Sequence, residues 1–383
     1  MLVKPVMLDV EHAPRGAAAT MGSLVLFSFV LCFSLLQAAC DPGMSGDDVS
    51  GDDGGPAVGC TLMPLTLTVA TLVGCEQDGN ADGERTVARF QNPTNVEIGA
   101  GGVVFVADFD NSLLRSIEPD GTTTTLVMRP DFTSPFGLAI ATDGSIYVET
   151  DDNDLGTHSI DSGTIWRVDP ETGDAVVIAR DLGRPRGLAM LPDGRIAMAD
   201  HMHHVVSILD PTTGIETTLA GTPDVAGHAN ASGAAARFAQ PYDVVLLPDG
   251  DLAVSDFDNH RIRRVTLAGV VTDLAGSGTV GNIDGPANVS TFDAPQGLAV
   301  GPGGLYVTDI RRFFIRRITN GVVKTVAGDG TAGWLDADEP RGARFYGIEG
   351  IATDATRLVI ADGNGGNGDV YHRIRTVNAA TLP

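Results

Sequence analysis

The segment PYDVVLLPDGDLAVSD, residues 241–256, decides the fold of this chain. It holds two short apolar runs joined by Asp-Gly, a dipeptide that favours a tight hairpin turn, and the second run ends in Asp256. Two further apolar runs follow, HRIRRV at 260–265 and VTDLAG at 271–276. The stretch therefore predicts four consecutive antiparallel strands.

Five other segments repeat this pattern. They begin at Pro93, Pro135, Pro185, Pro295 and Tyr346. The copies lie about 40 to 56 residues apart, which with four strands per copy is the period of a β-propeller blade. Because a blade buries its faces only against its neighbours, the repeats must close into a ring. We predict an all-β fold, a six-bladed β-propeller of four-stranded blades.

The strand count predicts how the ring closes. The sixth copy supplies three strands before the chain reaches NAATLP at 378–383, so its outer strand is missing. An unassigned segment before the first copy, LTLTVATLVG at 65–74, matches the fourth-strand type. We predict that this N-terminal strand completes the last blade and removes an exposed sheet edge.

Two stretches resemble a known repeat family. VSDFDNHRIRRV at 254–265 and DLAGSGTVGNIDG at 273–285 are similar to the two most recognisable parts of the NHL repeat. The resemblance covers about residues 66–383 and implies a six-bladed propeller. It implies little about activity, because propellers carry many functions.

The first forty residues have the layout of a secretory signal. Basic residues precede the apolar run SLVLFSFVLCFSLL at 23–36, which small residues follow. LLQAAC resembles a bacterial lipobox, in which the cysteine, here Cys40, becomes the lipidated first residue of the mature chain. An ordinary cleaved signal and an uncleaved anchor remain open, as does a start at Met1 or Met21. We expect an exported protein, lipid-anchored to the bacterial cell envelope on its periplasmic or outer surface.

Residues 41–59 are rich in Gly, Ser and Asp and read as a disordered linker, which assigns residues 60–383 to the propeller. Cys60 and Cys75 lie close together in sequence, so in an exported chain they are candidates for a disulfide, with two free thiols as the alternative.

Charge restricts the classes of partner. The chain has 25 basic and 49 acidic residues, a formal net charge of -24. A field of this sign repels nucleic acid and anionic lipid, so we expect no nucleic-acid partner and membrane contact only through the lipid anchor.

Loop length distinguishes the two faces of the predicted ring. In a four-stranded blade the turns after strands one and three share one face, and those after strands two and four share the other. The first set is tight, whereas the second set contains the long insertions, such as 221–240 and 276–294. We expect binding at this loop-rich face, since long loops on a rigid scaffold commonly bind ligands.

Some polar residues recur and others depart from the repeat. An aspartate ends the second strand of five blades: Asp108, Asp200, Asp256, Asp309 and Asp362, with Thr150 in blade 2. We interpret these aspartates as scaffold residues that accept backbone N–H bonds from the following turn. The stretch ADHMHHVV at 199–206 looks like a metal motif, but Asp200 and His204 fall on repeat positions. The true departures there are His201 and His203.

The first strand of each blade offers a variable residue at the predicted channel mouth. The six residues are Thr94, Phe136, Arg186, Tyr242, Gln296 and Glu349. This mixture of aromatic, cationic, amide and carboxylate groups suits a small polar ligand, a peptide or a partner protein.

A second set at the mouth consists of oxygen donors. Asn95 and Asp243 stand where three other blades have glycine, and Glu349 lies nearby. Asn, Asp and Glu oxygens suit Ca²⁺ or another divalent cation, and the set resembles the metal site of gluconolactonase-type propellers. Two weaker candidates are DDNDLG at 151–156, which begins like a calcium loop, and RRFF at 311–314, a possible partner contact.

Two classes of function remain open. The first is a non-enzymatic binding or protein-interaction scaffold, which we favour. The second is an enzyme, either a metal-dependent lactonase or hydrolase, or a lyase of the type found in propeller relatives that act on streptogramins and peptidyl-hydroxyglycine.

Overall fold

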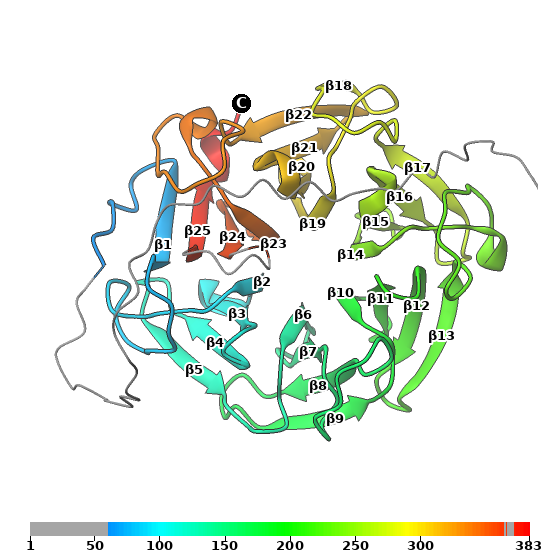
Figure 1. The fold of residues 1–383 in the computed structure, drawn as a ribbon, viewed down its shortest axis with the longest axis horizontal. Coiled ribbons are helices and arrows are strands. Elements are labelled where there is room, and N and C mark those ends of the chain that lie inside the picture. The colour runs from blue at the N-terminus through cyan, green and yellow to red at the C-terminus, as the bar shows by residue number, and fades with distance from the viewer. Residues whose placement is uncertain (1–59, 364, 366–370) are drawn as a thin grey trace, which may run out of the picture. The chain divides into compact units, whose positions relative to one another are not determined.

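The computed structural model describes residues 60–363, 365 and 371–383. The signal segment, Cys40 and the linker at 41–59 lie outside the described residues. Six antiparallel sheets stand in a ring around a central axis, with the first strand of each sheet nearest to the axis (Figure 1). The predicted all-β, six-bladed propeller is confirmed.

The first three blades have four strands each. Blade 1 consists of β2 (Pro93–Ile98), β3 (Val104–Asp108), β4 (Leu113–Ile117) and β5 (Thr123–Val127). Blade 2 consists of β6 (Pro135–Ile140), β7 (Ile146–Thr150), β8 (Thr164–Val168) and β9 (Ala175–Ala179). Blade 3 consists of β10 (Pro185–Met190), β11 (Ile196–Asp200), β12 (Val205–Asp210) and β13 (Ile215–Ala220).

The other three blades follow the same order. Blade 4 consists of β14 (Pro241–Leu246), β15 (Leu252–Asp256), β16 (Arg261–Val265) and β17 (Val271–Ala275). Blade 5 consists of β19 (Pro295–Gly301), β20 (Gly304–Asp309), β21 (Phe314–Thr319) and β22 (Val322–Ala327), with the two-residue β18 (Gly285–Pro286) on its outer edge. Blade 6 consists of β23 (Gly347–Thr353), β24 (Arg357–Gly363), β25 (His372–Asn378) and β1 (Val69–Cys75).

Among the described residues, helices are confined to six three-residue 3-10 turns. They are η1 (Ala100–Gly102), η2 (Gly233–Ala235), η3 (Phe257–Asn259), η4 (Ile310–Arg312), η5 (Pro340–Gly342) and η6 (Ala379–Thr381). Within the part of the chain that the structure describes, no helix has the length and apolar character needed to cross a bilayer.

The N-terminal strand β1 pairs antiparallel with β25 and forms the outer strand of blade 6. The register runs from Val69 opposite Val377 to Cys75 opposite His372. Cys60 and Cys75 form a disulfide with their Cα atoms 6.0 Å apart, which attaches the segment before β1 to the end of the strand.

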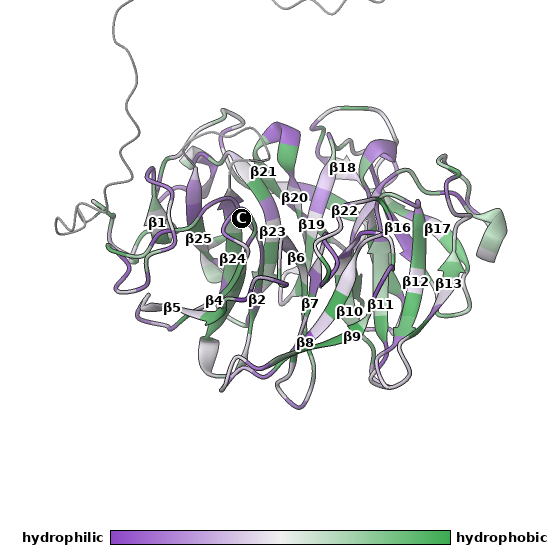
Figure 2. Cartoon of the chain, turned by 60° about the horizontal axis from the view of Figure 1, so that its bottom comes forward, coloured by the Kyte–Doolittle hydropathy of each residue, from purple (hydrophilic) through white to green (hydrophobic). Residues whose placement is uncertain are grey.

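Packing between neighbouring blades provides the core. Valine, leucine, isoleucine and phenylalanine side chains of adjacent sheets form mixed clusters, such as one shared by blades 3 and 4 around Phe238 and Val254. In Figure 2 the hydrophobic colour follows strands such as β9 and β12, while much of the connecting loop is polar. Each sheet thus buries the faces that the repeat pattern predicted.

A buried arginine–aspartate pair holds each of blades 1, 4, 5 and 6. The aspartate ends the second strand and the arginine lies on the third, with N–O distances between 2.5 and 2.9 Å. The pairs are Arg115 with Asp108, Arg263 with Asp256, Arg316 with Asp309 and Arg375 with Asp362. All eight side chains are at most 1% exposed, so each charge depends on its partner for solvation.

The same arginines fasten the long loops to the blades. In blade 1, Arg115 donates to the backbone oxygens of Arg89 and Ala81 and to Asp82, and its guanidinium lies 5.0 Å from the ring centre of Phe90. Blades 4, 5 and 6 repeat this arrangement with their own loop carbonyls and with Phe238, Phe292 and Phe345. Each long loop is therefore a fixed part of its blade.

The aspartates serve the scaffold, but their backbone donors differ from our prediction. Asp108 accepts from the backbone N–H of Gln91, which precedes the first strand, and Asp256 accepts from Ala239 in the same way. Asp200 accepts backbone N–H bonds from the following turn, at Met202 and His203, whereas Asp108 and Asp256 accept from that turn through the side chains of Asn111 and Asn259. In the other four blades the second carboxylate oxygen accepts from the buried arginine.

Blades 2 and 3 lack the arginine. In blade 2, Trp166 donates through Nε1 to the hydroxyl of Thr150 at 3.0 Å, and in blade 3 Ser207 stands on the third strand. The loops that lead into these two blades, 128–134 and 180–184, are also short. On this face blade 2 instead carries a long loop, 151–163, between its second and third strands.

Thr71 of β1 takes part in the hydrogen-bond network of the buried Arg375 in blade 6, because both residues bind Asp336. The backbone N–H and hydroxyl of Thr71 each donate to Asp336 at 3.0 Å, as Thr325 does to Asp284 in blade 5. Trp334 Nε1 also donates to the Thr71 hydroxyl at 2.8 Å. This side chain thus ties the N-terminal strand to a loop far along the sequence.

We expect Thr71→Val to lower the free energy of unfolding by about 1–3 kcal/mol, because it leaves buried donors and acceptors without a partner. The midpoint of urea unfolding measures the change. Thr66→Val, at an exposed position before β1, is the matched control and should leave the midpoint unchanged. Equal midpoints for the two variants would contradict this role of β1.

Candidate functional site

Arg186 forms the centre of the channel mouth on the loop-rich face. It is the second residue of β10, and its side chain is 14% exposed. Nε donates to Asp151 Oδ1 at 3.2 Å, one terminal nitrogen to Asp151 Oδ2 at 2.5 Å, and the other to the Tyr242 hydroxyl at 2.5 Å. These bonds use three of the five N–H groups of the guanidinium and hold it in one orientation.

Aromatic rings of three other blades surround this guanidinium. Its central carbon lies 4.2 Å from the ring centre of Phe136, 5.5 Å from Tyr242 and 5.9 Å from Phe109. Phe136 also meets Tyr242 and Phe109 edge to face, at 5.7 and 6.0 Å. The structure thus brings together three of the six predicted mouth residues: Phe136, Arg186 and Tyr242.

Three carboxyl groups lie around Arg186. Burial acts to raise the pKa of Asp151, but the charge and hydrogen bonds of Arg186 outweigh it and keep that pKa below its ordinary value. Burial raises the pKa of Glu349 to about 7 against the opposing charge of Arg186. Burial, with the charge of Asp151, also raises the pKa of Glu149. The ionised Asp151 therefore balances the arginine, Glu349 titrates near neutral pH, and Glu149 favours the neutral form.

Glu149 and Glu349 keep oxygens without protein donors. Glu149 is fully buried, and its Oε1 has no hydrogen-bond partner, while Oε2 accepts from Gly137 at 3.5 Å. Glu349 Oε2 accepts from Gln296 at 3.3 Å. Glu349, which is 8% exposed, therefore offers an acceptor near Arg186, whereas the unpartnered oxygen of Glu149 is enclosed within the protein.

The remaining predicted mouth residues are buried. Thr94 is 2% exposed and its hydroxyl donates to the backbone oxygen of Pro135 at 3.4 Å, while Gln296 is 3% exposed and pairs with Glu349. These residues connect neighbouring first strands. Phe136 and Glu349, at 4% and 8% exposed, lie just beneath the surface of the mouth.

The predicted metal ligands serve the contacts between blades. Asp243 Oδ2 accepts from the Leu298 N–H of blade 5 and Oδ1 from Val244, both at 2.7 Å, and Asn95 Oδ1 accepts from Val96 at 2.8 Å. No cluster of three or more His, Cys, Asp or Glu side chains suited to a metal ion occurs among residues 60–363, 365 and 371–383. A calcium site at these residues stays a prediction.

Glycine elsewhere in this ring has a steric reason. A Cβ on Gly297 would lie 2.3 Å from the backbone oxygen of Glu349, and one on Gly187 would lie 2.5 Å from Asp243 Cα. Neighbouring first strands therefore approach too closely for a side chain. Asn95 and Asp243 occupy the positions where a polar side chain replaces this close approach.

The histidines of ADHMHHVV have three separate roles. His204 accepts the backbone N–H of Gln240 through Nδ1 at 3.1 Å, and His260 and His372 make the same bond to the following blade. His201 is 6% exposed, lies 5.3 Å from the Tyr242 ring, and has a pKa lowered to about 4 by burial. The stretch therefore divides into scaffold residues and one neutral imidazole beside the mouth.

His203 faces a group of carboxylates. Its Nδ1 lies 2.7 Å from Asp200 and its Nε2 lies 3.0 Å from Asp161. The hydrogen bond with Asp200 raises the pKa of His203 to about 9. In blade 3 this imidazolium provides the positive charge that a buried arginine provides in four other blades.

The two weaker candidates are largely paired within the chain. In DDNDLG, Asp151 pairs with Arg186 and Asp154 with Arg180, so their carboxylates do not converge. In RRFF, Arg312 pairs with Asp293 at 2.9 Å, and Phe314 is buried in β21. Arg311 is 54% exposed and lies 5.2 Å from the Phe257 ring, next to Tyr242.

Sequence reasoning missed three residues of the mouth: Asp151, Glu149 and Phe109. The sequence held a signal for Glu149, since other blades have Ala, Ser or Thr at this strand position. In the sequence Asp151 looks like part of a solvent-exposed acidic loop, because its partner, Arg186, lies 35 residues away. Such a contact depends on the stacking of blades.

A family model and a curated protein match parts of the chain. Residues 238–265, which include β14, β15 and β16, match the family model described as NHL repeat. Over 145 residues, 35% of this chain, it is 30% identical to Protein SUPPRESSOR OF QUENCHING 1, chloroplastic, of Arabidopsis thaliana. The match covers only 14% of that protein.

Solved structures share the fold over most of the described propeller. A protein of unknown function from Bacteroides thetaiotaomicron has a TM-score of 0.66 at 21% identity, with 81% of this chain and 75% of that chain covered. An auxiliary nutrient binding protein from Bacteroides ovatus has a TM-score of 0.64 at 18% identity, with 81% and 76% covered. At these identities the likeness establishes the fold alone.

We expect His203 to stabilise the fold in a pH-dependent way. Its folded pKa of about 9 lies above the usual value for the unfolded chain, about 6.5. The stabilisation is thus complete below about pH 6.5 and is lost as the pH rises through about 9. Urea midpoints of the wild type and His203→Gln should differ most near about pH 6 and converge above about pH 9. A gap that stays constant over this range would contradict the assignment.

Proposed function

We propose that this protein is an envelope-anchored binding propeller that takes up a neutral polar ligand at the Arg186 mouth. The observation that supports this ligand class is the fixed guanidinium of Arg186, which keeps two N–H groups without a protein acceptor. Glu349 accepts from Gln296 through one carboxyl oxygen only, so its other oxygen remains available at the mouth. A ligand that bears both hydroxyl or amide donors and carbonyl or hydroxyl acceptors satisfies both sets.

The charge at the mouth supports a neutral ligand. Asp151 already neutralises Arg186, and the chain has a net charge of -24, so an anion gains little there. The rings of Phe136 and Tyr242 present faces and edges on which a sugar ring or a peptide group packs. We therefore propose sugars and short peptides as the ligand classes.

The comparisons agree with a binding role without assigning a ligand. One structural neighbour is described as an auxiliary nutrient binding protein, and the NHL repeat match lies in blade 4, which contributes Tyr242. The alternative of a propeller lactonase or lyase has less support, because the oxygens of Asp243 already accept backbone hydrogen bonds.

The anchoring part of the proposal depends on the lipobox-like segment that ends at Cys40. A lipidated cysteine followed by the linker at 41–59 would hold the propeller near the envelope. The protein would thereby meet ligands or partner proteins at the cell surface or in the periplasm.

The ligand proposal is tested with a panel of neutral mono- and oligosaccharides and terminally blocked di- and tripeptides. We expect at least one compound to raise the melting temperature of the wild type. Arg186→Lys keeps the positive charge but loses the planar guanidinium with its several N–H donors. This variant should bind the compound about tenfold or more weakly in isothermal titration calorimetry.

Arg195→Lys provides the matched control. Arg195 is exposed, pairs with Asp193 and lies in a tight turn at the other face, so this variant should bind as the wild type does. If no compound of the panel binds the wild type, or if Arg186→Lys binds as tightly as the wild type, the proposal fails.

Lipidation at Cys40 is tested in cells that express the full chain. We expect incorporation of an alkyne-labelled fatty acid and recovery of the protein in the membrane fraction. Cys40→Ser should abolish both, because it removes the thiol that receives the lipid. Cys32→Ser, within the apolar run, is the matched control and should keep the label. An unlabelled wild-type protein would contradict the anchor.

A further inference from the structure

A cavity of about 430 Å³ opens at the end of the channel opposite to the Arg186 mouth. Residues near the ends of the innermost strands of all six blades line it, and the tight turns surround its rim. Its size is within the range of small-molecule pockets, about 300–1,000 Å³. Nothing proposed for the loop-rich face uses this cavity.

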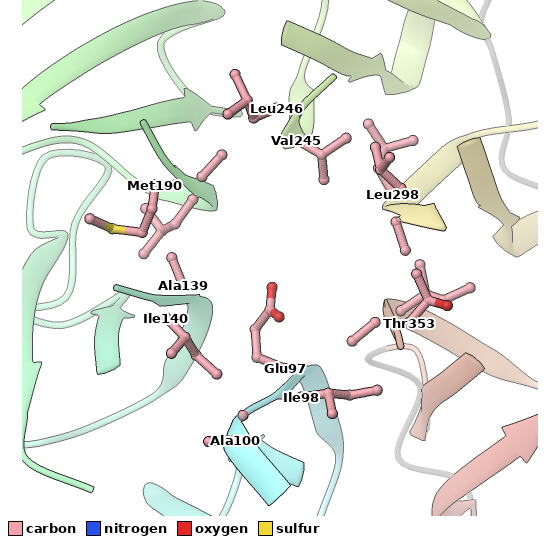
Figure 3. Close-up of a pocket in the computed structure, with 17 residues that line it drawn as sticks. Glu97, Ile98, Ala100, Ala139, Ile140, Met190, Val245, Leu246, Leu298 and Thr353 are labelled. Carbon is pink, nitrogen blue, oxygen red and sulfur yellow. The ribbon is translucent and has the colours of Figure 1, made fainter. Parts of the chain in front are cut away.

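Apart from Glu97 and Thr353, the side chains that line this cavity are aliphatic, and backbone atoms supply the rest of its polar surface. Ile98, Ile140, Met190, Leu246 and Leu298 contribute to it, and Figure 3 shows the carboxyl group of Glu97 directed into the open centre. Thr353 is the other polar side chain of the wall, but its hydroxyl donates to the backbone oxygens of Asp354 and Arg357 at 3.0 Å. Glu97 is thus the single side chain that offers unused polar atoms to a ligand.

Glu97 departs from the blade repeat. The strand register places it opposite Phe105, and the same position in the other blades holds Ala139, Ala189, Val245, Ala299 and Ala352. Five blades therefore show that the fold needs only a small or branched apolar residue there. A carboxyl group at this position is an addition that the packing of the ring does not require.

The surroundings leave the Glu97 carboxylate poorly compensated. No side chain donates a hydrogen bond to it, and its one donor is the adjacent backbone N–H of Ile98. Burial and the negative charge of Asp243 raise the pKa of Glu97 to about 8. A cation that entered the cavity would supply the missing partner, because two opposite charges attract strongly where water is scarce.

We propose that this cavity is a second binding site, for an organic monocation with a compact apolar body, such as an alkylammonium ion. The ammonium group would pair with Glu97 and the hydrocarbon would lie against the aliphatic wall. The acidic net charge of the protein raises the local concentration of such cations. The site is separate from the Arg186 mouth, and this proposal does not depend on the one made for the mouth.

The test compares three probes of equal chain length by isothermal titration calorimetry: n-hexylammonium, 1-hexanol and hexanoate. We expect hexylammonium to bind most tightly and hexanoate not to bind. Glu97→Gln should weaken hexylammonium binding about tenfold or more and change hexanol binding by less than about threefold. Failure of hexylammonium to bind the wild type, or equal binding to Glu97→Gln, overturns the proposal.

Two further variants keep the result interpretable. Glu118→Gln makes the same chemical change at an exposed position in a turn of the same face, and should leave hexylammonium binding unchanged. Glu97→Ala restores the residue found in four other blades, so it should fold, raise the melting temperature and still lose the preference for hexylammonium. A lower melting temperature for Glu97→Ala would mark Glu97 as a structural residue and overturn the proposal.

Discussion

A buried guanidinium must be surrounded by oxygen atoms, and four blades of this propeller depend on that requirement. In blades 1, 4, 5 and 6 the buried guanidinium of a third-strand arginine donates hydrogen bonds to an aspartate, to loop carbonyls and to a further polar side chain. The long loops on this face are fixed because they supply those oxygens. Where the arginine is missing, the loop before the blade is short.

The position of the candidate site follows from this asymmetry. The site belongs to blades 2 and 3, which lack the buried arginine–aspartate pair of the other blades. Its ionisable residues there are Arg186, Asp151 and Glu149. The positive charge there stands on the first strand, next to the axis, instead of inside the blade. The repeat thus builds a rigid frame, and its departures place charged and aromatic groups where a ligand can reach them.

The fold was predictable from the sequence because hydrophobic alternation and turn residues recur in every copy. The role of Asp108 and its equivalents was also predictable in part, since a residue repeated in five blades serves the blade. The arginine partner, seven residues later in blades 1, 4 and 5 and 13 residues later in blade 6, was present in the sequence, but its contacts were not recognised. The Arg186–Asp151 pair could not be predicted, because the two residues belong to different blades and only the packing of blade 2 against blade 3 joins them.

The pairing of β1 with β25 has a consequence for the order of events during synthesis. β1 leaves the ribosome first, yet its partner β25 is the last strand to be made. Blades 1 to 5 are built from continuous segments, whereas blade 6 requires the two ends of the propeller to meet. Closure is thus a late, non-local step, and until then β1 has an unpaired edge that a chaperone or a neighbouring chain could occupy.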